Sequence, residues 1–313
     1  MTEVLLFRAE DVLRAVTPER ALQAVRDAFL AYAHRRWTMP PKVYVANHPA
    51  GDFRAMPALG DGHAVLKWVT SFPGNPAKGL PTVTGIVLLS DASDGRLLAL
   101  LDAASVTALR TGAAAVLAAD ILGSPDATSA AVVGCGVNGK ATARAFLARG
   151  WPVAVYDVDP GRMEEVAAEL GTSVAGSLEE ALAADLVATV TPGQEVVIPQ
   201  GALRAGQHVS LMGADGPGKS EIAVSELLRC RLFCDDWEQA SHGGELQHAV
   251  RAGLLDRASV TDLGAVLAGK AEGRRLAEEI TAFDSTGLAI QDLAIALAAL
   301  RSASDLDLPR IRL

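Results

Sequence analysis

The six residues from Gly134 to Gly139, Gly-Cys-Gly-Val-Asn-Gly, form the pattern G-x-G-x-x-G. They follow a hydrophobic run and open a helical pattern, and Asp157 ends the next hydrophobic run. In a dinucleotide-binding unit, the first glycine permits a tight turn, the second lets the backbone approach a pyrophosphate, and the third lets helix and strand pack closely. The helix N-terminus supplies N–H groups to the phosphates. The context predicts such a site, and a glycine turn in another α/β unit is the alternative.

Asp157 indicates which dinucleotide would bind. A carboxylate at this position accepts hydrogen bonds from the adenosine ribose hydroxyls and repels a 2′-phosphate. Asp159 adds to that repulsion, whereas Arg162 lies near enough in the sequence to favour a phosphate. We therefore expect NAD as the cofactor, with NADP possible.

Four cations, Lys42, Arg54, Lys67 and Arg110, interrupt apolar sequence in an acidic chain. Because side chains alternate along a strand, each charge on a strand shares a face with apolar neighbours. Such cations either extend to water or meet an anion. Separate surface cations are the alternative, but four together predict a pocket for the carboxylate of a small substrate. Arg110, just before the dinucleotide unit, could bridge substrate and cofactor.

Asp215 lies in the glycine-rich turn 213–219, directly after the apolar run 207–212. Ligands of an open α/β sheet bind outside the carboxyl ends of its strands, so this turn should face the cofactor. A carboxylate there could act as a general acid or base. A turn or helix N-cap aspartate is the alternative.

The elements that must position these residues change character near residue 120. Before it, short apolar runs are separated by turns too short for parallel crossovers, so they predict antiparallel strands at 43–47, 53–59, 64–70, 82–89 and 96–102. Helical patterns flank them at 9–36 and 103–122. From residue 127, apolar runs alternate with helices, which predicts parallel strands at 129–133, 153–157, 186–190, 207–212, 231–235 and 280–283, with a last helix after them.

The predicted fold class is therefore α/β, a Rossmann dinucleotide-binding domain with a parallel sheet plus an α+β substrate-binding and dimerisation domain with an antiparallel sheet. We place the substrate domain at 1–118, completed by the C-terminal helix 289–313, and the NAD(P)-binding domain at 119–288.

Composition excludes several classes of protein. The chain has 313 residues, of which 50% are hydrophobic and 21% charged, so it can bury a large core and is not disordered. Its net charge of −9 argues against binding nucleic acid or an anionic membrane. We find no signal peptide and no uncharged apolar run of 18 residues, and three cysteines suit a reducing compartment, so we expect a cytoplasmic protein.

Two groups of potential metal ligands do not have the spacing of a metal site. Cys230 and Cys234 have no second pair, and His242, Glu245 and His248 do not form H-E-x-x-H. We expect no metal.

Seven segments together resemble the ornithine cyclodeaminase/mu-crystallin family. They are residues 39–42 (MPPK), 53–59, 66–85, 107–115 (TALRTGAAA), 132–141 (VVGCGVNGKA), 213–222 (GADGPGKSEI) and 283–294 (FDSTGLAIQDLA), in family order across nearly the whole chain. The LRTGA block and the GADGPGK turn are the most specific. The resemblance implies a homodimer of two-domain subunits that transfers hydride between a nicotinamide and the α-carbon of an amino acid or cyclic imine.

The resemblance also implies roles for individual residues. Lys42, Arg54, Lys67 and Arg110 would hold the substrate carboxylate, although Lys42 replaces the usual arginine and so loses a bidentate fork. Asp215 matches the catalytic aspartate and would handle protons with Lys67, while Thr286 would lie beside the substrate. The implied cofactor contacts are Thr82, Arg110, Thr111, Gly134, Gly136, Val137, Asn138, Gly139, Asp157, Thr191, Met212, Lys219 and Ser285.

The family divides by reaction. We expect an NAD(P)-dependent amino-acid dehydrogenase or imine (ketimine) reductase that resembles alanine dehydrogenase and acts on a small amino or imino acid. One alternative is an ornithine cyclodeaminase, which converts L-ornithine to L-proline and ammonia. A second is a nicotinamide-dependent small-ligand binding protein of the mu-crystallin type. The presence of Asp215 and Lys67 favours an enzyme, and the substrate side chain stays open.

Overall fold

The computed structural model describes residues 3–312, which divide into two compact units. Unit 1 contains the residues up to Arg110 and those from Leu288 on, and unit 2 is Thr111–Gly287. The first division falls inside helix α3 (Ala103–Leu122), whereas the sequence predicted a boundary after residue 118. Because α3 is one continuous apolar helix, no turn or change of composition marks the point at which its contacts change from one unit to the other.

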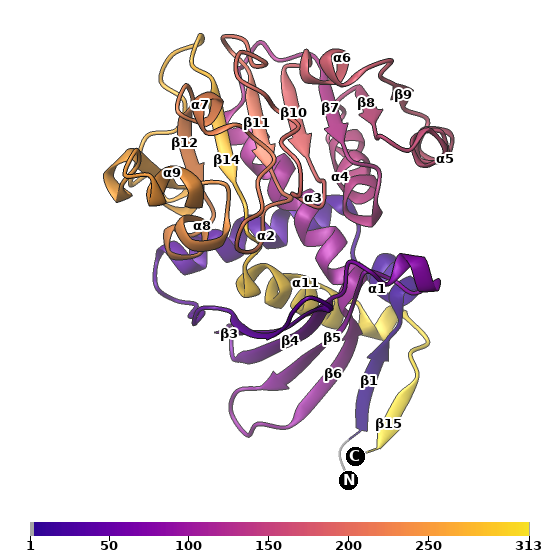
Figure 1. The fold of residues 1–313 in the computed structure, drawn as a ribbon. Coiled ribbons are helices and arrows are strands. Elements are labelled where there is room, and N and C mark those ends of the chain that lie inside the picture. Colours follow the sequence, from indigo (N-terminus) through magenta and orange to yellow (C-terminus); the bar gives the residue numbers. More distant parts are fainter. Residues whose placement is uncertain (1–2, 313) are drawn as a thin grey trace. The chain divides into compact units, whose positions relative to one another are not determined.

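Unit 1 contains a seven-stranded sheet with the order β15-β1-β6-β5-β4-β3-β2 (Figure 1). Its strands are β1 (Glu3–Phe7), β2 (Val43–Asn47), β3 (Gly51–Gly60), β4 (His63–Ser71), β5 (Val83–Asp91), β6 (Leu97–Asp102) and β15 (Arg310–Arg312). The five predicted strands are confirmed as antiparallel neighbours, β2 to β6. The sheet as a whole is mixed, because β1 pairs with β6 in parallel and with β15 in antiparallel orientation. Turn spacing could not predict these pairs, which join distant parts of the chain.

The helices of unit 1 cover one face of this sheet. They are α1 (Ala9–Ala15), α2 (Pro18–Ala33) and α11 (Ala289–Arg301), with the 3-10 turns η1 (Pro76–Lys78) and η3 (Ala303–Asp305). Helix α11 packs on β3, β4 and β5, and α1 packs on β1 and β6. The helical pattern predicted over 9–36 is two helices, because Thr17 caps a new helix and Pro18 occupies its first turn.

Unit 2 contains an eight-stranded sheet with the order β13-β12-β14-β11-β10-β7-β8-β9, and every registered pair is parallel, as predicted. Its strands are β7 (Ala130–Val133), β8 (Val153–Tyr156), β9 (Ser173–Val174), β10 (Leu186–Thr189), β11 (His208–Leu211), β12 (Arg231–Cys234), β13 (Val260–Asp262) and β14 (Thr281–Asp284). Its further helices are α4 (Val137–Ala148), α5 (Pro160–Leu170), α6 (Leu178–Leu182), α7 (Val224–Leu227), α8 (Trp237–Gly243), α9 (Gln247–Arg251) and α10 (Leu263–Leu267), with the 3-10 turn η2 (Arg257–Ser259).

The strand order of unit 2 reverses at β7. From β7 the chain continues to β8 on one side, and it later returns to β10 on the other side (Figure 1). Such a reversal opens a crevice outside the carboxyl ends of the two central strands, and ligands of open α/β sheets bind there. A cofactor site is therefore expected at the turns that follow β7, β10 and β11.

Helix α3 is long and apolar enough to cross a membrane by length and composition. Within the fold, however, 78% of its apolar window is buried. It also contains Arg110 and Asp120. The core helix of a soluble protein has the same character, so this helix is weak evidence of a membrane span.

Candidate functional site

The glycine turn after β7 has the geometry that its three glycines predict. Gly134 has a φ of +104°, and a Cβ there would lie 2.6 Å from the carbonyl oxygen of Val190. A Cβ on Gly139 would overlap the carbonyl oxygen of Gly134. At Gly136, by contrast, a Cβ would meet no described protein atom within 4 Å. The fold itself requires the first and third glycines, whereas the second leaves the backbone open to a ligand, which fits a pyrophosphate.

Asp157 is fixed beside this turn. Its Oδ2 accepts a hydrogen bond from the backbone N–H of Cys135 at 2.6 Å, and its Oδ1 accepts one from Asp159 at 2.9 Å. Arg162 pairs with the carboxylate of Asp159, with 3.3 Å between Nε and Oδ2. Arg162, the cation that could favour the 2′-phosphate of NADP, is therefore already paired with an acidic residue. Turn, helix start and carboxylate together fit the adenosine half of NAD.

A buried glutamate that the sequence analysis did not select joins the next two turns. Oε1 of Glu221 accepts the backbone N–H of Thr191 at 2.7 Å. Oε2 accepts the Thr189 hydroxyl and the backbone N–H of Gly213, each at 2.7 Å. Glu221 thus ties the turn after β10 to the turn after β11. Glu221 lies in the segment 213–222 that resembles the family, which could have marked it as a site residue. The neighbouring sequence does not indicate which groups its side chain contacts.

Asp215 lies half-buried in the turn after β11. Its Oδ1 is 2.5 Å from Nζ of Lys219. The next helix, α7, has Ala223 as its N-cap, so the helix-cap alternative for Asp215 is wrong. The sequence assigned Asp215 and Lys219 to different functions, whereas the structure pairs them.

The turn after β14 is held by Asp235 at the end of β12. The Ser285 and Thr286 hydroxyls donate to its two carboxylate oxygens at 3.1 and 3.3 Å, and the N–H of Gly287 donates at 2.8 Å. Ser285 and Thr286 are both buried. Ser285 and Thr286 were predicted from the sequence. Asp235 was not, although it is a carboxylate at the end of a predicted strand.

Behind these turns lies a group of buried carboxyls, Glu221, Glu245 and Asp284. Glu245 accepts the backbone N–H of Glu221 at 2.7 Å and the hydroxyl of Ser220 at 2.8 Å. Burial, with Glu221 nearby, raises the pKa of Glu245 to about 8. Burial, Glu245 and Asp235 raise the pKa of Asp284 well above its usual range. In residues 3–312 no three His, Cys, Asp or Glu side chains are grouped to hold a metal ion.

The cations of unit 1 centre on Lys67, whose side chain is buried on the sheet face that α11 covers. Its Nζ lies 2.8 Å from each carboxylate oxygen of Asp292 and 3.3 Å from the hydroxyl of Thr107. Burial lowers the pKa of Lys67 to about 8; Asp292 opposes this shift, and Arg110 adds to it. Lys67 is therefore a lysine that can exchange a proton near neutral pH.

Two predicted arginines lie near this lysine. Nε of Arg110 is 3.9 Å from Oδ1 of Asp292. Arg54 binds Asp52 through Nε at 2.6 Å and Nη2 at 3.3 Å, and its guanidinium lies 5.3 Å from the ring centroid of Tyr44. Arg54, Lys67 and Arg110 are thus brought together, as predicted, from β3, β4 and α3. Asp292 is a further charged residue of this group that the sequence analysis missed.

The remaining predicted residues have the following places. Lys42 lies just before β2 and Thr82 just before β5, and both are half-buried. Thr111 and Met212 are buried in unit 2. Val137, the first residue of α4, is 70% exposed, and the carbonyl of Asn138 accepts a hydrogen bond from Thr142.

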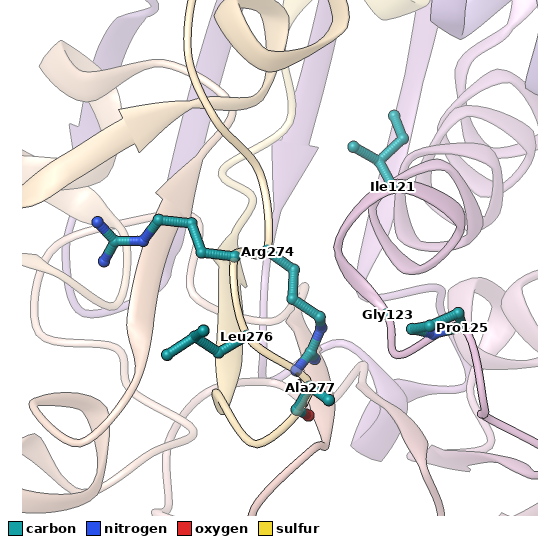
Figure 2. Close-up of a pocket in the computed structure, with 7 residues that line it drawn as sticks. Ile121, Gly123, Pro125, Arg274, Leu276 and Ala277 are labelled. Atoms are coloured by element: carbon teal, nitrogen blue, oxygen red, sulfur yellow. Dashed lines mark hydrogen bonds between the residues drawn. The ribbon is translucent and has the colours of Figure 1, made fainter.

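A cavity of about 310 Å³ opens elsewhere in unit 2 (Figure 2). It is lined by Ile121, Gly123, Pro125, Arg274, Arg275, Leu276 and Ala277. Arg274 donates to the carbonyl oxygens of Leu122 and Gln207 at 2.8 and 2.9 Å. Gln207 directly precedes β11, so the cavity adjoins the amino ends of the strands, the edge away from the Asp215 turn. Arg274 joins segments of the fold there, and the cavity is not the candidate site.

The sequence model of the ornithine cyclodeaminase/mu-crystallin family matches residues 2–305. The chain belongs to this family. An alanine dehydrogenase of Archaeoglobus fulgidus is 41% identical over 303 residues, which cover 94% of this chain and 93% of the relative.

Solved structures agree with this assignment. An archaeal alanine dehydrogenase dimer with bound NAD superposes with a TM-score of 0.93 at 39% identity, and the match covers 99% of each chain. The iminosuccinate reductase of Paracoccus denitrificans in complex with NAD⁺ gives 0.90 at 28% identity, covering 100% of each chain. The fold predicted from the sequence, a parallel dinucleotide-binding sheet with a separate, largely antiparallel sheet, is confirmed.

Proposed function

We propose that this protein is an NAD-dependent amino-acid dehydrogenase of the alanine dehydrogenase type. In the oxidative direction, alanine, NAD⁺ and water give pyruvate, ammonium, NADH and a proton. The observation that carries the proposal is the cationic group Arg54, Lys67 and Arg110, which suits a small carboxylate substrate, in a chain whose glycine turn fits NAD. The alanine dehydrogenase relatives support the choice of substrate.

Substrate binding falls to the cations of unit 1. Arg110 and Arg54 carry permanent charge and can donate to the two carboxylate oxygens of an amino acid. Lys42 would add a single ammonium in place of a bidentate fork, so its hold on the carboxylate would be looser. We assign Thr286 to the substrate side chain. Alanine needs a small substrate pocket, and the alanine dehydrogenase relatives support a pocket of that size.

Cofactor binding falls mainly to the glycine turn and the turns around it. The open backbone at Gly136 and the first N–H groups of α4 would receive the pyrophosphate. Asp157 would accept the ribose hydroxyls, which favours NAD over NADP. We assign the remaining contacts to Thr82, Arg110, Thr111, Gly134, Val137, Asn138, Gly139, Thr191, Met212, Lys219 and Ser285.

Bound NAD⁺ supplies the hydride acceptor for the α-carbon. The residues of the chain supply charge and proton transfer. Lys67, whose pKa is lowered to about 8, can take a proton from the substrate ammonium and return it to the leaving ammonia. Asp215, whose carboxylate lies 2.5 Å from the Lys219 ammonium, can accept a proton from the water that adds to the imine. The product carboxylate stays bound to the arginines until the other groups have reacted.

The test measures NADH absorbance with purified protein. Pyruvate with ammonia should oxidise NADH, and alanine with NAD⁺ should produce it. Ornithine with NAD⁺, followed by proline detection, is the parallel arm. Proline formed without net change in NADH would replace our proposal with a cyclodeaminase. If NADH bound tightly while every substrate stayed unreacted, the protein would be a nicotinamide-dependent binder.

An imine reductase is the second candidate, supported by the likeness to iminosuccinate reductase. The same hydride geometry serves a preformed imine, and the hydration step is then absent. A cyclic ketimine carboxylate or iminosuccinate reduced much faster than pyruvate with ammonia would favour this candidate. In that case Asp215 would have no water to deprotonate, and Lys67 would supply the proton to the nitrogen.

We also propose a homodimer formed through the uncovered face of the unit 1 sheet. Five half-buried apolar residues lie in register across this face from strand to strand: Pro57, Leu66, Leu88, Leu100 and Leu6. Trp68, also on this face, is 39% exposed and stacks on Phe53. A continuous apolar surface of this kind usually marks a protein contact, and a second copy of the chain is supported by the dimeric relative.

Light scattering on size-exclusion fractions tests the dimer. Leu88→Glu should shift the protein to monomers, because it would bury a charge at the interface. Leu254→Glu, at an exposed apolar residue of unit 2, is the matched control and should remain dimeric. An unchanged mass for Leu88→Glu would place the dimer contact elsewhere.

We propose a cytoplasmic location. The cysteines Cys135, Cys230 and Cys234 are all free thiols in the structure, and burial raises the pKa of each, so none is activated for disulfide exchange. Fractionation of cells that express the protein with an epitope tag would test the location.

A further inference from the structure

We propose that Asp292, on α11, is a positioning residue for the reaction: it holds the Lys67 ammonium in place and sustains its protonated form. The inference rests on the proposed function, in which Lys67 exchanges protons with the substrate. It assigns to the C-terminal helix a part in the chemistry in addition to its packing on the sheet.

The contact between the two side chains is close, and Oδ1 of Asp292 is the oxygen that accepts the hydrogen bond. Nζ of Lys67 lies 2.8 Å from Oδ1 and 2.8 Å from Oδ2 of Asp292. The side chain of Asp292 is fully buried and that of Lys67 is 2% exposed. Little water is therefore available to replace either partner. Nζ also lies 3.3 Å from the hydroxyl of Thr107.

The groups that face Lys67 from every neighbouring element show why a carboxylate is needed there. On β5 the opposite residue is Val87, and on β3 it is Met56, so neither strand offers a charge directly opposite. Arg54 on β3 and Arg110 on α3 both disfavour a further positive charge. Arg54 has Asp52 as its own partner. Asp292 thus supplies the negative charge on which the protonated form of Lys67 depends.

The fold also holds the carboxylate in place. Asp292 lies in the first turn of α11, where the helix dipole favours a negative charge. The preceding residue, Gln291, accepts the backbone N–H of Leu288 through its side chain and so fixes the start of the helix. Helix α11 is buried along nearly its whole length and packs on β4, the strand of Lys67. The carboxylate therefore has little freedom to leave the lysine.

The kinetic test uses Asp292→Asn, which keeps the shape and removes the charge. We expect kcat to fall at least tenfold, and the limb of the kcat–pH profile that reports Lys67 to move to lower pH. The KM for NADH should stay within twofold. Asp305→Asn removes an exposed carboxylate shortly after α11 and should behave as wild type. If both limbs of the kcat–pH profile of Asp292→Asn lay at the same pH as in wild type, the proposal would be overturned.

A second measurement reads the lysine without turnover. The chain has six lysines, so NMR of protein labelled with [ε-¹³C]lysine gives few signals, and Lys67→Arg identifies that of Lys67. We expect the Lys67 midpoint to be lower in Asp292→Asn than in wild type. Equal midpoints would overturn the proposal. A shifted midpoint with unchanged kcat would overturn it too, since the pair would then be structural only.

Two further results distinguish a failure of folding from a failure of the proposed function. The double variant Lys67→Met with Asp292→Asn removes both charges of the pair and should unfold cooperatively, yet stay inactive. If wild type turned over none of the substrates, the proposed function would fail. The NMR titration would still decide whether Asp292 sustains the Lys67 ammonium.

Discussion

Buried carboxylates occur in both units, and their surroundings differ. In unit 1, Asp292 lies 2.8 Å from the Lys67 ammonium and 3.9 Å from Arg110. In unit 2, Glu245 and Asp284 lie near other carboxyls and accept hydrogen bonds from backbone N–H groups, and their pKa values are raised. The same type of group therefore serves as a counter-ion in one unit, whereas in the other its pKa is raised by burial and by neighbouring carboxyls.

The difference follows from what each unit must hold. A site for a small anion needs excess positive charge, and one buried carboxylate limits the repulsion among the cations without cancelling them. A dinucleotide site is built from backbone turns, and a buried acid can join such turns by accepting hydrogen bonds from their N–H groups. Charge thus serves substrate recognition in unit 1, whereas burial raises the pKa of the carboxyls behind the turns of unit 2.

The largest effect is expected for Lys67→Met. It leaves Asp292 buried without its ammonium, which should lower the free energy of unfolding by about 3–5 kcal/mol. Turnover should fall by about 10²–10⁴-fold because a proton-transfer group is lost. Urea denaturation and steady-state kinetics measure the two effects. Lys78→Met, at an exposed lysine of η1, is the control and should change neither. Equal stability of the two variants would contradict the view of Asp292 as a counter-ion.

The next largest effect is expected for Asp215→Asn. This carboxylate is half-buried and paired with Lys219, so its loss should leave the fold intact. We expect kcat to fall by about 10²–10⁴-fold. NADH affinity, measured by fluorescence titration, should stay near the wild-type value. Turnover close to wild type with NADH still bound would remove Asp215 from the mechanism.

A pH-dependent effect is expected for Glu245→Gln. In the folded protein Glu245 keeps its proton up to about pH 8, whereas its usual pKa is 4.5. Between these values the folded state binds more protons than the unfolded state, so stability falls as pH rises. The amide removes this dependence, and the variant should gain about 1 kcal/mol per pH unit relative to wild type across that range. Free energies of unfolding, measured by denaturation at several pH values, test this prediction. The same pH dependence of stability in the variant and in wild type would contradict it.

The smallest effect is expected for Asp157→Ser, at a half-buried carboxylate that accepts backbone hydrogen bonds from Cys135 and Asp159. Removing its charge should relax the preference for NAD over NADP by about tenfold, since the 2′-phosphate is no longer repelled. Stability should change by less than about 1 kcal/mol. The ratio of kcat/KM for the two cofactors is the measurement. An unchanged ratio would mean that other residues select the cofactor.

The sequence predicted the elements better than their connections. Strand 43–47 and helix 103–122 have the predicted bounds, because alternation and helix-forming composition are local properties. It missed β1 and β15, whose partners are distant, and it joined α1 and α2 across Thr17, where the capping residue and proline mark a break. Of the predicted site residues, Arg54, Lys67 and Arg110 are brought together in unit 1.

The sequence by itself determined the glycine turn and its adjoining carboxylate. These depend on backbone conformations and spacings within about 25 residues, which a linear pattern can express. Only the tertiary structure decided that Lys67 pairs with Asp292, 225 residues away, and that Glu221 joins two turns of unit 2. A carboxylate within an apolar helix is visible in the sequence. Its partner is set by long-range packing, and so is its role as a counter-ion, because both depend on which charges share its buried surroundings.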